Sequence, residues 1–92
     1  MNIEHEESET KGAFFIKDAS TKIAEITYSK AGASRIIIDH TEVSDDHRGE
    51  GLGKILVAHT AKFAHEHTLE IIPLCPYAKA VLARNPEMLN PK

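Results

Sequence analysis

The 92-residue sequence contains a single cysteine, Cys75, so no disulfide can form within the chain. It has no apolar run as long as a membrane span, and its first residues do not resemble a signal peptide. Lys and Arg number 11 against 14 Asp and Glu, so the basic excess that is typical of nucleic-acid-binding proteins is missing. We therefore expect a cytoplasmic protein that binds neither nucleic acid nor membrane. The mildly acidic balance is compatible with a cationic amine as substrate.

The sequence also lacks internal repeats, low-complexity segments and the length for a second domain. We expect one domain over residues 1–92 with a small core. Its content of 41% hydrophobic and 27% charged residues is ordinary for a soluble globular protein. Residues 1–12 are polar and acidic, with little to bury, so we expect them to form a flexible lead-in.

The pattern of apolar residues predicts a small α/β (α+β) domain. Three strands are expected over residues 13–17, 22–28 and 35–43, and the short turns between them indicate an antiparallel meander. The third strand is rich in β-branched residues. Strict alternation along it would place His40 and Glu42 on the same face as Ile36 and Ile38.

An amphipathic helix is expected over residues 52–67, because its apolar residues fall on one broad arc. A short apolar strand at 69–72 follows, and the strand–helix–strand order predicts a parallel, right-handed crossover. Cys75 and Pro76 are expected to open a second helix, since proline suits the first helical turn. That helix should end at Asn85, before Pro86.

Three glycines lie between the third strand and the first helix, in the run V-S-D-D-H-R-G-E-G-L-G-K from residue 43 to 54. Glycines at such a junction allow a ligand to approach the backbone, and a helix N-terminus offers unpaired N–H groups to an anion. The run therefore indicates a phosphate-binding loop. The alternative is a plain helix-entry loop that uses glycine only for its turn geometry.

The spacing of the glycines separates this loop from two common nucleotide-binding loops. A dinucleotide-binding fingerprint would need glycine where Lys54 stands. A Walker A loop would need glycine in place of Arg48 and Ser or Thr in place of Ile55. The pattern that does fit is R-x-x-G-x-G, formed by Arg48, Gly51 and Gly53.

That pattern resembles the acyl-CoA pyrophosphate loop of the GNAT superfamily of N-acetyltransferases. The runs D-H-T-E-V before the loop and I-I-P-L-C-P-Y-A-K-A-V-L-A-R-N-P-E after it extend the resemblance over residues 36–87, toward a short single-domain, YjdJ-like branch. The resemblance implies a minimal GNAT-like fold: a three-stranded meander, a crossover helix, a fourth parallel strand and a C-terminal helix. It also implies acetyl-CoA (coenzyme A) as cosubstrate. Full-size members usually carry an additional strand and two helices before the central hairpin, and this chain has no room for them.

The resemblance implies where acetyl-CoA would bind. Backbone N–H groups of the loop would hold the pyrophosphate, and the pantetheine arm would lie between the strands at 35–43 and 69–72. Basic residues on the helices are available for the 3′-phosphate, although such residues on exposed helix faces mostly interact with water. The candidate cofactor-binding residues are Thr41, Glu42, Val43, Arg48, Gly49, Glu50, Gly51, Leu52, Gly53, Lys54, Tyr77, Lys79 and Arg84.

Two residues are candidates for catalysis, His40 and Cys75. Imidazole side chains titrate near neutral pH, so His40 suits a general base; the alternative is a histidine hydrogen-bonded on the sheet surface. Cys75 lies at a helix start, where N–H groups favour a thiolate, and it would either carry the acetyl group or protonate the CoA sulfur. Its alternative role is that of a small buried apolar residue. Tyr77 is a further candidate proton donor, or a packing residue.

No metal site is expected, because the H-E-x-x-H pattern fails after both His5 and His65.

Together with His40 and Cys75, the resemblance of the glycine loop implies an acetyl-CoA-dependent N-acetyltransferase that acts on a small amine or a protein lysine. The alternative is a CoA-binding module with little or no transferase activity, because the elements that shape the acceptor site in larger members are missing.

Overall fold

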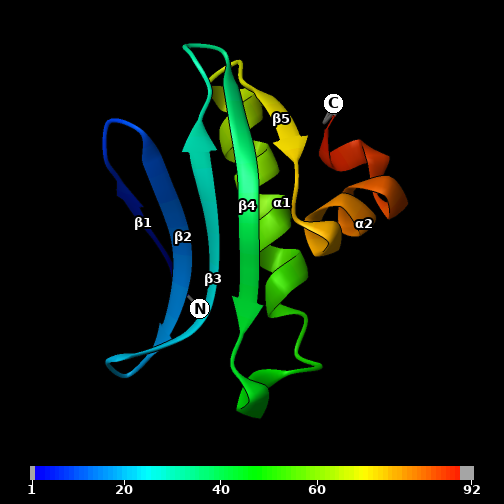
Figure 1. Cartoon of the computed structure of the whole chain (residues 1–92). Helices are drawn as coiled ribbons and strands as arrows, with labels where there is room; N and C mark the ends of the chain where they lie inside the picture. The colour runs from blue at the N-terminus through cyan, green and yellow to red at the C-terminus, as the bar shows by residue number, and fades with distance from the viewer. Residues whose placement is uncertain (1, 90–92) are drawn as a thin grey trace.

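The computed structural model describes residues 2–89, which form one five-stranded mixed sheet with helices packed against it (Figure 1). The strands follow one another across the sheet in chain order; the first four are antiparallel and the fifth is parallel to the fourth. This arrangement confirms the predicted α+β fold and its parallel crossover. The elements are β1 (Ile3–Glu7), β2 (Lys11–Asp18), β3 (Thr21–Lys30), β4 (Arg35–Val43), α1 (Leu52–Glu66), β5 (Glu70–Pro73) and α2 (Pro76–Arg84), with 3₁₀ turns at Asp45–His47 and Pro86–Met88.

The strand β1 was not predicted. It pairs antiparallel with β2 and forms one edge of the sheet. Four of its five residues are exposed, and it is held by the partly buried Ile3 and by His5, whose ring stacks on Phe14 with centroids 4.2 Å apart. A strand that buries so little has no apolar alternation to reveal it. The segment expected to be a flexible lead-in therefore contains the outermost strand.

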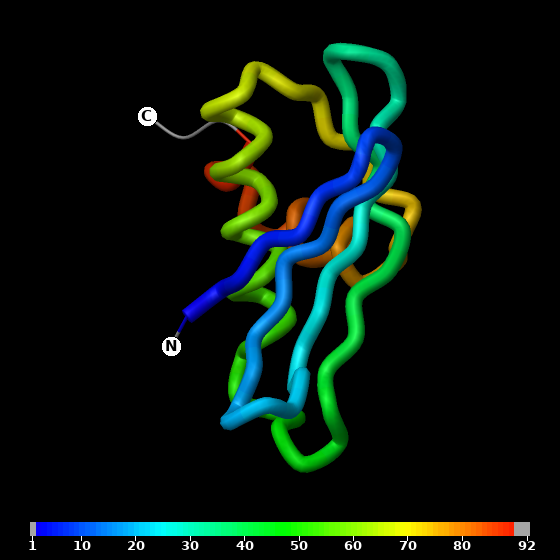
Figure 2. Tube along the Cα trace, turned by 90° about the vertical axis from the view of Figure 1, so that its left-hand side faces the viewer, coloured from blue at the N-terminus to red at the C-terminus, as the bar shows by residue number. Residues whose placement is uncertain are grey.

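The core lies between the sheet and α1. Phe14, Tyr28 and Ile38 from the strands meet Leu56 and Val57 of the helix, and all five are essentially inaccessible to solvent. The helix buries the apolar arc that the sequence predicted. Seen edge-on, the sheet carries its helices on one side, and the other face of β1–β4 is covered by no helix within residues 2–89 (Figure 2).

A β-bulge interrupts the alternation of β4. His40 pairs with Thr27 while Ile38 pairs with Tyr28, so Asp39 is an extra residue on this strand. A bulge of this kind shifts the alternation by one position. His40 consequently lies on the face away from α1, in contrast to the face shared with Ile38 that strict alternation predicted.

The strands β4 and β5 pair over only four positions and then separate. The last pair is Ile38 with Pro73, after which the N–H groups of Leu74 and Cys75 both donate to the Ile38 carbonyl oxygen. β4 continues to Val43, and within residues 2–89 no strand pairs with this part of its edge. A gap therefore opens between the second half of β4 and the start of α2.

Candidate functional site

A pocket of about 550 Å³ lies where β4 ends and α1 begins. Its lining comes from the second half of β4, the glycine loop, the start of α1 and the first turn of α2. We call it the loop pocket. Its lining residues are Thr41, Val43, His47, Arg48, Gly49, Gly51, Leu52, Gly53 and Tyr77.

The backbone of the loop requires glycine at two positions. Gly49 and Gly51 have φ of 86° and 77°, in the left-handed region that side chains disfavour. Gly51 is also the N-cap of α1, and no side chain of residues 2–89 caps this helix end. The first helical bond runs from the Ile55 N–H to the Gly51 carbonyl oxygen at 3.1 Å. The three N–H groups before Ile55 therefore have no partner within the helix.

Gly53 is required for a different reason. A Cβ at this position would lie 2.6 Å from the hydroxyl oxygen of Tyr77, so the tyrosine ring packs directly on the glycine backbone. Tyr77 is 44% exposed and borders the pocket. The glycine thus makes room for a side chain of α2, whereas the R-x-x-G-x-G pattern predicted only the approach of a phosphate.

The charges around the loop are already paired within the loop itself. Arg48 Nε lies 2.9 Å from Asp45 Oδ1, and His47 Nδ1 lies 3.2 Å from Glu50. Both carboxylates are largely exposed, and exposed pairs of this kind contribute little to stability. Arg48 can therefore exchange its carboxylate for a phosphate at small cost. His47 lines the pocket but was not among the predicted residues. Its position between two acidic residues and Arg48, within the glycine run, could have indicated it.

Cys75 is buried at the mouth of the gap between β4 and α2, as the N-cap of α2. Its thiol donates to Thr41 Oγ1 at 3.6 Å. Burial raises the pKa of the thiol, but hydrogen bonds from the backbone of Ala78, the side chain of Thr41 and the backbone of Tyr77 outweigh it. The pKa of Cys75 therefore lies below that of an ordinary thiol, because N–H groups and a hydroxyl stabilise the thiolate.

The structure does not bring the two predicted catalytic residues together on one face. His40 is exposed on the face away from α1, and its Nε2 lies 2.6 Å from Glu42 Oε1. Thr41, between them in sequence, points to the opposite side and reaches Cys75. The bulge at Asp39 is the reason, since without it His40 would share the face of Ile38.

The remaining predicted cofactor residues divide into two groups. Thr41, Val43, Arg48, Leu52, Tyr77 and the three glycines line the loop pocket. Glu42, Glu50, Lys54, Lys79 and Arg84 are exposed and do not line it. Lys79 and Arg84 are both on α2.

Among residues 2–89, no three His, Cys, Asp or Glu side chains are placed to hold a metal ion. In the same part of the chain, neither helix has the length and apolar character needed to cross a bilayer.

Comparison with known proteins points to one family. Residues 13–90 match the family model of the GCN5-related N-acetyltransferases. The solution structure of a GCN5-like protein from Staphylococcus aureus superposes with a TM-score of 0.71 and 39% identity, over 95% of this chain and 84% of that one. A Bacillus anthracis protein solved in complex with acetyl coenzyme A shares the fold, with a TM-score of 0.60, 21% identity, and coverage of 72% and 39% of the two chains.

A curated relative matches a shorter segment. The streptothricin acetyltransferase of Streptomyces lavendulae is 44% identical over 43 residues, which are 47% of this chain and 22% of that protein. The match thus spans about a fifth of the length of the curated relative.

Proposed function

Because this chain belongs to the GCN5-related N-acetyltransferase family, we propose that it binds acetyl-CoA and transfers the acetyl group to an amine, on a small molecule or a protein lysine. One observation carries the proposal: the loop pocket joins an uncapped helix N-terminus to the gap between β4 and α2, with a thiol at the mouth of that gap. A helix N-terminus suits the pyrophosphate of a ligand, and the gap that continues from it suits an extended arm of the same ligand.

The pyrophosphate would bind at the start of α1. Its oxygens would accept hydrogen bonds from the backbone N–H groups of Leu52, Gly53 and Lys54, and the helix dipole adds roughly 0.3–1 kcal/mol per interaction. Arg48 would leave Asp45 for a phosphate, a charge-assisted contact. Support comes from the acetyl coenzyme A complex of a protein with the same fold.

The pantetheine arm would lie in the gap. Its amides would pair with the free edge of β4 around Thr41 and Val43, as an added strand does. Tyr77 would close one side of the arm, and its contact with Gly53 fixes where the ring stands.

In the transfer step, the amine lone pair attacks the thioester carbonyl carbon, and the carbon–sulfur bond then breaks. We assign Cys75 the role of giving its proton to the departing CoA sulfur. The thiolate left on Cys75 is stabilised by Thr41 and by the backbone of Ala78 and Tyr77. The proton lost by the amine goes to solvent and replaces the one given by Cys75, so that the step is balanced.

The competing function is that of a CoA-binding module without transfer. The observation that favours it is the uncovered face of β1–β4, where within residues 2–89 no helix encloses an acceptor. It predicts acetyl-CoA binding without acetylated product over a broad panel of amines.

Acetyl-CoA binding measured by calorimetry tests the proposal, and the chain offers a matched control. Gly51 and Gly32 have φ of 77° and 76°, and neither has a neighbour within 4 Å of a Cβ. Gly51→Ala and Gly32→Ala should therefore lose similar stability, about 1–2 kcal/mol. Only Gly51→Ala should weaken acetyl-CoA binding, by tenfold or more. Absence of binding to the wild type at millimolar acetyl-CoA would overturn the proposal.

A further inference from the structure

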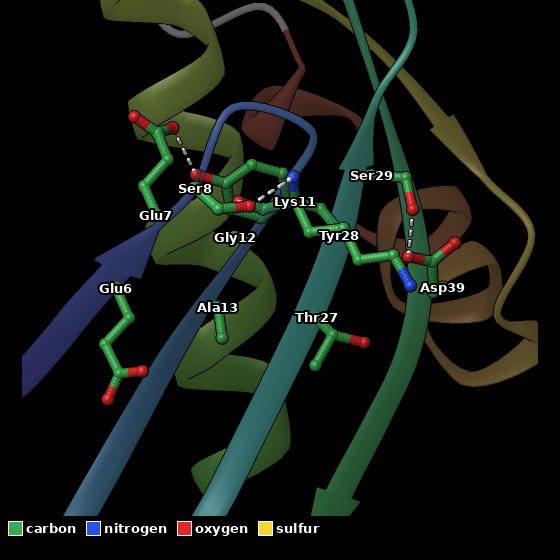
Figure 3. Close-up of a pocket in the computed structure, with 10 residues that line it drawn as sticks. All are labelled: Glu6, Glu7, Ser8, Lys11, Gly12, Ala13, Thr27, Tyr28, Ser29 and Asp39. Carbon is green, nitrogen blue, oxygen red and sulfur yellow. Dashed lines mark hydrogen bonds between the residues drawn. The ribbon is translucent and has the colours of Figure 1, made fainter.

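A second hollow of about 550 Å³ lies on the sheet face away from α1, and we propose that it binds the acceptor as a primary alkylammonium ion, an inference that rests on the proposed function (Figure 3). We call it the sheet hollow. It is lined by Glu6, Glu7, Ser8, Lys11, Gly12, Ala13, Thr27, Tyr28, Ser29 and Asp39.

The shape of the sheet hollow follows from side-chain size. Its floor consists of the small side chains of Ala13, Thr27 and Ser29, on β2 and β3. Longer carboxylate side chains rise on both sides, Glu6 from β1 and Asp39 from β4. The small side chains of the floor leave room for an alkyl chain, and both walls carry negative charge.

Glu6 and Asp39 are the carboxylates that face the hollow. The Glu7 carboxylate lies on the α1 side of the sheet, where it accepts the hydroxyl of the buried Tyr28 at 2.7 Å. Asp39 accepts a hydrogen bond from Ser29 Oγ at 2.7 Å. A carboxylate accepts about four hydrogen bonds, so Asp39 keeps the capacity to bind an ammonium group with its position fixed by Ser29.

The chain itself places an alkylammonium group in this hollow. The Lys11 side chain extends from β2 across β3 in the direction of Asp39 (Figure 3). The alkyl part of a lysine side chain therefore fits between Glu6 and Asp39, with its ammonium group on the side of Asp39. An acceptor amine of the same chemistry would take this place once Lys11 turns out to solvent.

The hollow also adjoins the gap on the other side of the sheet. Asp39 is the bulged residue of β4, two positions before Thr41, a separation of about 7 Å along a strand. Thr41 contacts Cys75 at the gap. The ammonium ion loses one proton to solvent before its lone pair attacks the thioester carbonyl carbon.

The test is a titration of the uniformly ¹⁵N-labelled full chain with butylammonium chloride, followed by NMR without acetyl-CoA. We expect the shift changes to centre on the amides around Ala13, Thr27 and Asp39. Asp39→Asn, which keeps an oxygen for Ser29, should weaken binding at least fivefold. Lys11→Ala should tighten it twofold or more. The matched control Asp18→Asn, at the far end of β2, should leave the affinity unchanged.

A second titration of the same samples with acetyl-CoA separates this inference from the proposed function. If acetyl-CoA binds but butylammonium gives equal affinities in wild type, Asp39→Asn and Asp18→Asn, the sheet hollow is not the acceptor site and the inference is overturned. If butylammonium behaves as expected and acetyl-CoA does not bind, the proposed function fails while the alkylammonium site stands. In turnover assays at saturating acetyl-CoA, Asp39→Asn should raise the KM of the amine with little change in kcat.

Discussion

Cys75 shows how one residue acquires a chemical role from its surroundings. The thiol is 6% exposed, which disfavours its charged form, yet the start of α2 and the side chain of Thr41 supply enough donors to lower its pKa. A proton donor needs this combination, since it must hold its proton in a dry site and leave a stabilised anion. A purely structural cysteine would not need the donors.

We expect Cys75→Ala to lower kcat about 100-fold, the lower range for loss of a general acid, while leaving acetyl-CoA affinity within twofold. Turnover assays that detect the thiol of the released CoA measure kcat. Calorimetry on the same preparations measures the affinity for acetyl-CoA. Mass spectrometry of the wild type after incubation with acetyl-CoA alone should find Cys75 unmodified. An acetylated Cys75 would instead show that it carries the acetyl group.

Two glycines with close neighbours should respond differently to alanine. A Cβ on Gly12 would lie 2.2 Å from the ring of Tyr28, which is fully buried, whereas a Cβ on Gly53 would meet the exposed end of Tyr77. We expect Gly12→Ala to lower the free energy of unfolding by about 3 kcal/mol, the upper range for overpacking. Gly53→Ala should change it by less than about 1 kcal/mol, because the tyrosine can move aside and alanine favours a helix.

Urea unfolding of both variants checks this expectation. Gly53→Ala should nevertheless weaken acetyl-CoA binding, since it displaces Tyr77 from the loop pocket. Equal destabilisation by the two substitutions would contradict the assignment of Tyr77 as the movable partner.

At the scale of elements, β1 is joined to α1 through aromatic and imidazole rings. Phe14 stacks on His5 of β1 and meets His59 of α1 edge-on, with centroids 4.8 Å apart. Burial lowers the pKa of His59, and the positive charges of His5 and Lys62 lower it further against an opposing effect of Glu66. Protonation of His59 therefore favours the unfolded chain.

The free energy of unfolding should fall as the pH decreases below about 6.5, the ordinary pKa of histidine, because the unfolded chain takes up a proton that folded His59 resists. His59→Leu should remove most of this slope between pH 6.5 and the lower pKa of the folded state. His65→Gln, an exposed position on the same helix, serves as the control and should keep it. An unchanged slope in His59→Leu would show that another group causes the pH dependence.

The elements that the sequence predicted well are those with a strong local signal. β4 is rich in isoleucine, α1 has an apolar arc, and Pro76 and Pro86 delimit α2, so the bounds of all three were close to those observed. β1 was missed because it buries little and shows no apolar alternation, and the bulge at Asp39 was missed because it is defined only by the pairing of β4 with β3. The loop pocket was largely predictable because R-x-x-G-x-G is a local pattern, whereas the separation of His40 from Cys75 was not, because it depends on that bulge.

For the whole molecule, the main consequence is that the two hollows lie on opposite faces of one sheet. The loop pocket opens beside α1, and the sheet hollow opens on the face that no helix of residues 2–89 covers. In our proposal neither ligand blocks the entry of the other, and the reacting groups meet at the edge of β4. Both ligands would then be bound together before transfer.

Initial rates measured over a grid of acetyl-CoA and amine concentrations should therefore give intersecting lines in double-reciprocal plots. A ternary complex requires this pattern, and acetyl-CoA should raise the melting temperature equally with and without the amine. Parallel lines would indicate that CoA leaves before the amine binds, and would contradict simultaneous occupation of the two faces.

The bulge at Asp39 lets β4 hold an extra residue without changing which of its later side chains face α1. Deletion of Asp39 would make the pairs Ile38–Tyr28 and His40–Thr27 consecutive, so His40, Thr41, Glu42 and Val43 would all keep their faces. Homologous chains can therefore lose the residue at this position without turning its neighbours over, so that in an alignment this site should tolerate a gap of one residue. Such chains would keep the loop pocket and lose the Asp39 carboxylate of the sheet hollow.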